Sequence, residues 1–190
     1  MTNKIKYGLK NVHYAVITET DGAITYGTPT PIPGAVNISL PAAGEEFTFY
    51  ADDMVYFEGQ VNNGYEGDLE MALIPDSFRK DVLQESEDEK GVLFEDSNVF
   101  PKPIALLFEF NGDVKQTRHV LYNVSVARPS VESGTKTNTI EPKTDTLSLK
   151  ARPAKDTGYV KSKTTAATDA QAYADWYNTV HVFAEPAPGA

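Results

Sequence analysis

Apolar residues recur at every second position along most of this 190-residue chain. A period of two places the apolar side chains on one face of a β-strand and the polar side chains on the other. Glycine, proline, asparagine and aspartate separate the runs, as expected of turns. Many short strands of this kind predict a mainly β protein in which two antiparallel sheets pack as a sandwich. The alternating runs lie at 12–16, 36–40, 47–49, 55–61, 69–73, 104–110, 120–126 and 147–149.

The segment 62–64, with the sequence Asn-Asn-Gly, predicts a hairpin turn between two of these runs. A three-residue loop with Gly64 in the left-handed conformation pairs Val61 with Tyr65. This register places every apolar residue of 55–73 on one face, which we expect to join the core.

The opposite face of this predicted hairpin is acidic. It carries Glu58, Glu66, Asp68 and Glu70, and it sets Glu58 directly across from Asp68. Like charges in that position destabilise a sheet, so a sequence selected only for folding would alternate the signs. We therefore treat these four residues as a candidate site. The alternative is that they form an ordinary solvent-exposed face of the sheet. A glycosidase-like pair formed by Glu58 and Asp68 is a third interpretation.

A second hairpin is expected around 111–113, where a three-residue loop would place Glu109 opposite Lys115. A helix is predicted after Pro75, with Asp76 or Ser77 as its cap. That helix would bury Phe78 and Val82 on one face.

A second helix is predicted over 168–178, because Thr168 and Gln171 have the spacing of a capping box. Its apolar stripe, with Trp176 near the end, should dock on a sheet. The polar segment 129–146 is expected to be a long exposed loop or arm. Residues 1–183 would then form a single domain, and 184–190 a flexible tail. The stripe consists of Ala172, Tyr173, Trp176 and Tyr177.

Residues that could carry chemistry are sparse. Cysteine is absent, which excludes disulfides, thiol nucleophiles and cysteine-based zinc sites. His13, His119 and His181 lie far apart in predicted strands without metal-ligand spacing, so structural roles are expected. The acidic segment 85–89 could attract calcium, but it lacks the glycine and spacing of an EF-hand, which favours a solvated loop. The sequence thus predicts no catalytic residue, no cofactor and no metal site.

The formal net charge of −10 disfavours sequence-independent binding to nucleic-acid phosphates. It also fits a protein that is merely kept soluble by its charge. The sequence contains no apolar run of 18 residues, so a membrane span is not expected. The first residues lack the apolar stretch of a signal peptide, and export through a leader is not expected either.

Seven short phrases follow one another in order along residues 5–153. They read YGLKNVHYA at 7–15, PIPGAV at 31–36, GYEGDLE at 64–70, LIPD at 73–76, ALLFEF at 105–110, RHVLY at 118–122 and RP at 128–129. In this order they resemble the major tail proteins of siphophages, the long-tailed bacteriophages. None of the phrases is a catalytic fingerprint, and their collinear order is the main part of the resemblance.

The resemblance implies two packed antiparallel sheets with a flanking helix, in a subunit that is a structural protein and not an enzyme. Six copies would close into a ring, and rings would stack into the tail tube of the virion after synthesis in the bacterial cytoplasm. Implied partners are further copies of the chain and the tail terminator, tail-tip and tape-measure proteins. Genomic DNA would pass through the tube without specific binding, and no membrane is involved.

Within such a tube, Glu58, Glu66, Asp68 and Glu70 are candidates for a lumen-facing strip that repels DNA phosphates. An alternative of another class is a stand-alone β-sandwich that binds carbohydrate or a protein surface. A tube protein should form rings or tubes, whereas a binding module should stay small. An enzyme is the third alternative.

Overall fold

The computed structural model describes residues 2–135 and 142–184, and strands dominate them. Nine described strands form one antiparallel sheet in the order β2-β1-β10-β11-β12-β7-β4, with β3 beside β1 and β13 beside β11. The prediction of a mainly β protein with antiparallel strands is therefore confirmed, and these nine strands form one large sheet. These strands are β1 (Lys6–Thr20), β2 (Ala23–Tyr26), β3 (Thr30–Pro31), β4 (Ala35–Ser39), β7 (Tyr65–Met71), β10 (Ile104–Gly112), β11 (Thr117–Val126), β12 (Asp145–Arg152) and β13 (Lys161–Lys163).

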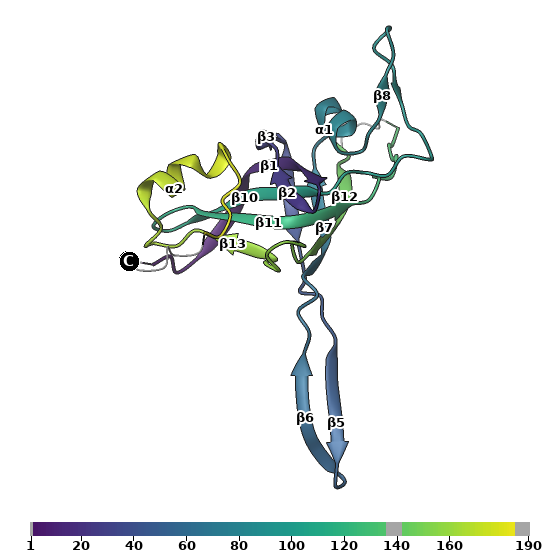
Figure 1. The fold of residues 1–190 in the computed structure, drawn as a ribbon. Coiled ribbons are helices and arrows are strands. Elements are labelled where there is room, and N and C mark those ends of the chain that lie inside the picture. Colours follow the sequence, from purple (N-terminus) through teal and green to yellow (C-terminus); the bar gives the residue numbers. More distant parts are fainter. Residues whose placement is uncertain (1, 136–141, 185–190) are drawn as a thin grey trace.

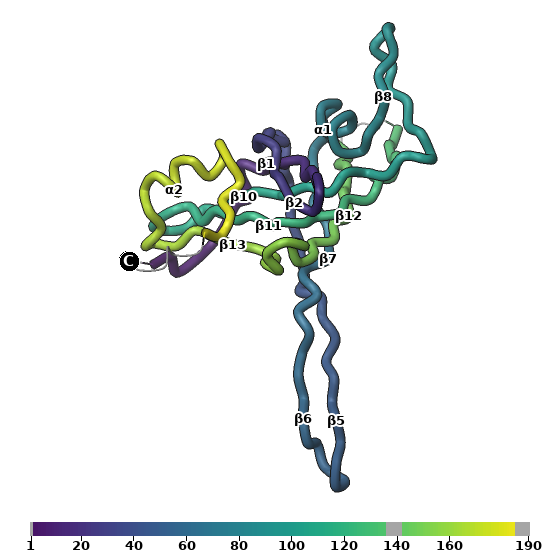
Figure 2. The backbone as a smooth tube through the Cα atoms, viewed as in Figure 1, coloured from purple at the N-terminus to yellow at the C-terminus, as the bar shows by residue number. Residues whose placement is uncertain are grey.

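Two two-stranded hairpins project from this sheet. One consists of β5 (Glu46–Ala51) and β6 (Met54–Gln60), and the other of β8 (Ser86–Glu87) and β9 (Leu93–Phe94). Figure 1 shows them extending in opposite directions from the body of the molecule. The same two projections stand out in the backbone trace of Figure 2.

The large sheet curls around a first core. Strands β1 and β4 lie far apart in the hydrogen-bonded order, yet they come into contact, because the sheet bends back on itself. Buried side chains from β1, β7, β10, β11 and β12 meet inside this curve. Burial of this apolar surface is the main stabilising contribution to the fold.

Helix α1 (Asp76–Asp81) closes one side of the first core, as predicted. Phe78 is buried there and meets the ring of Tyr14 edge-on, with 5.1 Å between the ring centroids. Val82, just after the helix, is also buried, as expected. The predicted cap is wrong, because Pro75 occupies the N-cap position and none of the described side chains caps it.

A second core lies on the other face of the sheet. Residues 104–108 of β10 are all buried, because both faces of this central strand are covered. Helix α2 (Ala170–Ala174) and the 3₁₀ turn η1 (Asp175–Tyr177) pack there through Trp176. A helix within the predicted segment 168–178 is confirmed, but it spans only 170–174 before the 3₁₀ turn. Of the predicted stripe, Trp176 and Tyr177 pack on the sheet. The cap of the helix is Asp169, which accepts hydrogen bonds from the backbone of Gln171 and Ala172, whereas Thr168 binds the backbone of Thr165.

The predicted turn at 62–64 is wrong. Strand β7 pairs with β4 and β12, and the ladder between the β4 and β7 chain segments continues outward into the β5–β6 pair. Residues 35–71 thus form one long hairpin that reverses at Asp52 and Asp53, whose φ angles are 52° and 59°. Two positive φ angles in a two-residue loop are typical of the type I′ turn, and aspartate tolerates them.

Gly64 has another role in this long hairpin. Its φ is +94°, and a Cβ atom there would overlap the carbonyl oxygen of Ala151 on β12. Glycine is required because two backbones approach closely, and not because the chain turns.

The β10–β11 hairpin also differs in register from the prediction. Glu109 lies opposite Arg118 and not opposite Lys115. The Asn3 side chain accepts hydrogen bonds from the backbone of Val114 and Lys115, at 3.0 and 2.9 Å. This contact from the N-terminal segment holds a longer loop than the local sequence indicates.

The described parts of the segment predicted as a loop, 129–135 and 142–144, contain neither helix nor strand. Strand β12 begins at the end of that segment, at Asp145. Residues 136–141, and the predicted tail from 185 onward, lie outside the described residues.

Candidate functional site

The four residues of the predicted acidic strip do not share one surface. Glu66, Asp68 and Glu70 lie on β7 in the large sheet, whereas Glu58 lies on β6 in the projecting hairpin. Glu58 is opposite Thr48, not Asp68. The expected like-charge pair is therefore absent, and with it the geometry on which the glycosidase interpretation depended.

Each of the three carboxylates on β7 has a partner on or next to β12. Glu66 forms ion pairs with Arg152 and, at 3.8 Å, with Lys150. The Arg152 hydrogen bond holds the pKa of Glu66 below its usual range.

The other two carboxylates accept hydrogen bonds from neutral hydroxyls. Asp68 accepts from Ser148 Oγ at 2.8 Å, and Glu70 accepts from Thr144 Oγ1 at 2.6 Å. Because a hydroxyl is neutral, it does not offset the charge of a carboxylate. Asp68 and Glu70 therefore make this face of β7 acidic.

A buried ion pair fixes the C-terminal helix to the sheet. The Glu109 side chain, in a residue only 5% exposed, accepts from Arg118 Nε at 3.2 Å and from Asn11 Nδ2 at 2.9 Å. The Arg118 guanidinium lies 3.9 Å from the ring centroid of Tyr173 and donates to the Tyr173 carbonyl oxygen. Tyr177 completes the cluster by donating to Glu109 at 3.4 Å. Because each charge is paired and hydrogen-bonded, this cluster is suited to holding structure rather than to catalysis.

The histidines serve packing, as expected. His13 stacks on Tyr177 with 4.5 Å between ring centroids, and His181 stacks on Trp176. His119 stacks on Phe108, and burial, helped by nearby lysines, lowers the pKa of His119 to about 4. Within residues 2–135 and 142–184, no three histidine, aspartate or glutamate side chains are placed to hold a metal ion.

The strongest candidate for a functional surface is residues 46–60, here called the arm, which comprises β5, its turn and β6. In its ladder Phe49 lies opposite Phe57, and Phe47 opposite Gly59. The Phe47 ring occupies the space that a side chain at Gly59 would need, and it lies 5.7 Å from the ring of Phe57. Figure 1 shows the arm standing clear of the body.

The arm exposes apolar side chains at an unusual density. Seven of them are between 46% and 70% exposed. An exposed apolar surface on this scale marks an interaction site in a soluble protein. The alternation at 47–49 and 55–57 correctly indicated strands, but the expectation that the apolar face of 55–73 joins the core is wrong for Val55 and Phe57, which are exposed. The seven are Phe47, Phe49, Tyr50, Met54, Val55, Tyr56 and Phe57.

The opposite projection, β8–β9, is acidic and partly apolar. Lys80 lies 2.8 Å from Glu87, and Arg79 lies 3.2 Å from Glu85, so ion pairs hold its base to helix α1. Phe94, which lies opposite Ser86 at the base of this hairpin, is exposed.

Comparison of the sequence with protein-family models and with curated proteins gives no match in either case. The functional conclusion therefore depends on the geometry of the chain itself. Among the described residues, no helix has the length and apolar character needed to cross a membrane.

Proposed function

We propose that this protein is a structural subunit that assembles into a tube like the tail tube of a long-tailed phage. Six copies close into a ring, rings stack, and DNA passes through the channel. The observation that carries the proposal is the arm, an apolar hairpin that projects from a well-packed body and requires a partner surface.

The size of the arm suits a stable contact. Its five aromatic side chains are between 46% and 70% exposed, and such side chains bury roughly 200 Å² each, so about 600 Å² of ring surface is available. At about 25 cal/mol per Å², covering all of it contributes at most about 15 kcal/mol. This is comparable to the 4–15 kcal/mol that association costs in lost freedom, so contacts elsewhere must add to it.

The shape also favours repeated head-to-tail contacts. The arm and the β8–β9 projection extend in opposite directions, so a copy offers different surfaces on its two sides (Figure 1). A contact between two different surfaces generates closed rings or open filaments, whereas a self-complementary contact stops at a dimer. In this proposal, the two halves of the curled sheet correspond to the two packed sheets of a sandwich.

The proposed channel is lined by the acidic face of β7. Asp68 and Glu70 keep their charges there, and six copies of them would repel DNA phosphates without binding a sequence. The subunit acts as a building block and not as an enzyme. Its partners are further copies of the chain and the tail terminator, tail-tip and tape-measure proteins. Its location is the virion tail, after synthesis in the bacterial cytoplasm.

Sedimentation velocity over a range of concentrations tests this proposal. The matched variant replaces 46–60 by an Asn-Gly turn that joins Glu45 to Val61, which removes the arm and leaves the body intact. The wild type should form a species near 125 kDa, the mass of six 20.8 kDa chains, and larger stacks. The variant should remain a monomer. A wild type that is monomeric at every concentration and salt condition contradicts the proposal and favours a stand-alone binding module.

A further inference from the structure

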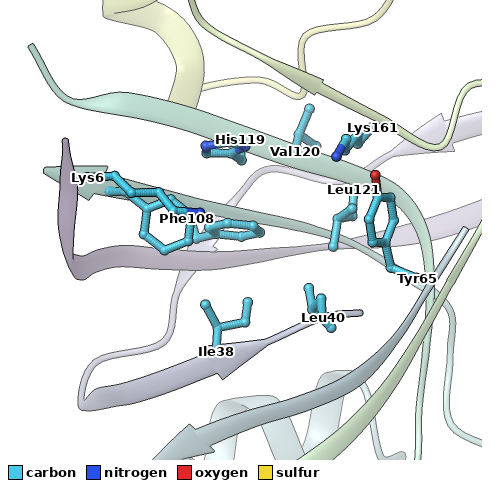
Figure 3. A pocket seen from close by; sticks show the side chains of 10 residues that line it. Lys6, Ile38, Leu40, Tyr65, Phe108, His119, Val120, Leu121 and Lys161 are labelled. Carbon is cyan, nitrogen blue, oxygen red and sulfur yellow. The ribbon is translucent and has the colours of Figure 1, made fainter. Parts of the chain in front are cut away.

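A pocket of about 220 Å³ opens on the body between strands β4, β7, β10, β11 and β13. Figure 3 shows Ile38 and Leu40 on one side of the pocket and Leu121 with His119 on another, and Phe108 lies between them. An engineered apolar cavity of about 150 Å³ binds benzene, so this pocket has room for one aromatic side chain. It is lined by Lys6, Ile38, Leu40, Tyr65, Phe108, Phe110, His119, Val120, Leu121 and Lys161.

Two lysines lie at the edge of this pocket. The Lys6 ammonium lies 5.3 Å from the ring centroid of Phe110, and the Lys161 ammonium lies 4.2 Å from that of Tyr65. Within the described part of the chain, neither lysine forms an ion pair with a carboxylate. The pocket is therefore a positive spot on a chain with a net charge of −10.

The tip of the arm has the complementary chemistry. Asp52 and Asp53 form its turn, and the exposed side chains of Tyr50, Met54 and Tyr56 flank them. A tyrosine ring matches the apolar pocket, and two carboxylates match two lysines. The acidic β8–β9 projection offers the arm no such match, because like charges would repel the tip.

We propose that the arm tip of one copy docks in the lysine-edged pocket of a second copy. One tyrosine ring inserts between the apolar walls, while Asp52 and Asp53 face Lys6 and Lys161. This inference rests on the proposed assembly, because its occupant is a second copy, and it names the surface that receives the arm. Tip and pocket are different surfaces, so each copy both gives and receives an arm, as a ring requires.

Site-specific cross-linking tests the docking directly, because the chain contains no cysteine. Copies with Met54→Cys, at the tip, are mixed with copies carrying Lys161→Cys, at the pocket, and treated with a short bis-maleimide. The matched control replaces Lys161→Cys by Thr25→Cys, an exposed position on β2. We expect a cross-linked pair for the first mixture and at least tenfold less for the control.

The outcomes separate the two proposals. Rings that form without the Met54–Lys161 cross-link overturn the docking and leave the assembly standing. Equal cross-linking at Thr25 also overturns the docking. A protein that never assembles overturns both.

Charge removal gives an independent measurement. Asp52→Asn with Asp53→Gly keeps a turn that favours positive φ and removes both charges. Lys6→Gln with Lys161→Gln removes the opposing pair. Each double variant should associate about three- to thirty-fold more weakly than the wild type and lose much of its salt dependence. The variant that combines all four substitutions should associate no more weakly than either double variant alone. If the fold-losses in association of the two double variants multiply in the combined variant, the pairing of these charges is contradicted.

Discussion

Removing aromatic rings from the arm should weaken assembly without destabilising the folded monomer. Phe49→Ser together with Phe57→Ser removes two rings that lie opposite one another in the arm, each in a residue 59% exposed. A phenylalanine side chain buries roughly 200 Å², so about 120 Å² of each ring remains to be covered by a partner. At about 25 cal/mol per Å², full coverage of both contributes about 6 kcal/mol to association. The association constant should therefore fall by as much as about 10⁴-fold.

The stability of the monomer should hardly change in the same variant. Neither ring belongs to either core, so we expect the free energy of unfolding to change by less than about 1 kcal/mol. Urea unfolding followed by circular dichroism measures that quantity, and sedimentation velocity measures assembly. The control is Leu69→Ala, at a residue 0% exposed in the first core, which should cost about 2–5 kcal/mol of stability and leave the arm intact. Wild-type assembly by Phe49→Ser with Phe57→Ser would refute the role given to the arm.

Three further predictions concern the body. Gly64→Ala should destabilise the fold by more than about 2 kcal/mol in urea unfolding, because its Cβ would overlap the Ala151 carbonyl at a positive φ. The pKa of His119 is lowered to about 4 in the folded protein, so as the pH falls the unfolded chain binds a proton at this histidine before the folded protein does. The contribution of His119 to the free energy of unfolding should therefore be full above about pH 6.5 and decline toward pH 4. His119→Phe should flatten the dependence of the free energy of unfolding on pH between about 6.5 and 4. An unchanged pH dependence in this variant would contradict the role given to His119. Asp68→Lys with Glu70→Lys should leave tubes intact but slow DNA passage, and normal DNA release through correctly assembled tubes would exclude a channel role for the β7 face.

The sequence predicted strands well because alternation is a local property. Runs such as 104–110 and 120–126 alternate, and they form β10 and β11. The same alternation does not indicate whether an apolar face meets the chain's own core or another molecule. Phe57 and Leu69 look alike in sequence, yet one is exposed on the arm and the other is fully buried.

The candidate site was misplaced because turn signals competed. The Asn-Asn-Gly segment at 62–64 is a stronger hairpin signal than the Asp-Asp pair at 52–53, but the chain reverses at the latter. Position 64 requires glycine for another reason, the close approach of β12. That reason depends on a strand about 85 residues further along the chain, which no local pattern contains.

Long-range contacts also decided the second hairpin. Asn3, more than 100 residues earlier in the chain, binds the backbone of the 113–116 loop, and Glu109 lies opposite Arg118 in the resulting register. The helix near the C-terminus was predictable because its stripe is local, and Trp176 lies where that stripe indicated.

The central claim is that the chain builds a tube. Electron microscopy of the purified, full-length protein at high concentration tests it most directly. The account predicts rings with six subunits and a central channel, and stacks of such rings with a constant diameter. Fields that contain only single 20.8 kDa particles, in every salt condition tried, would contradict it.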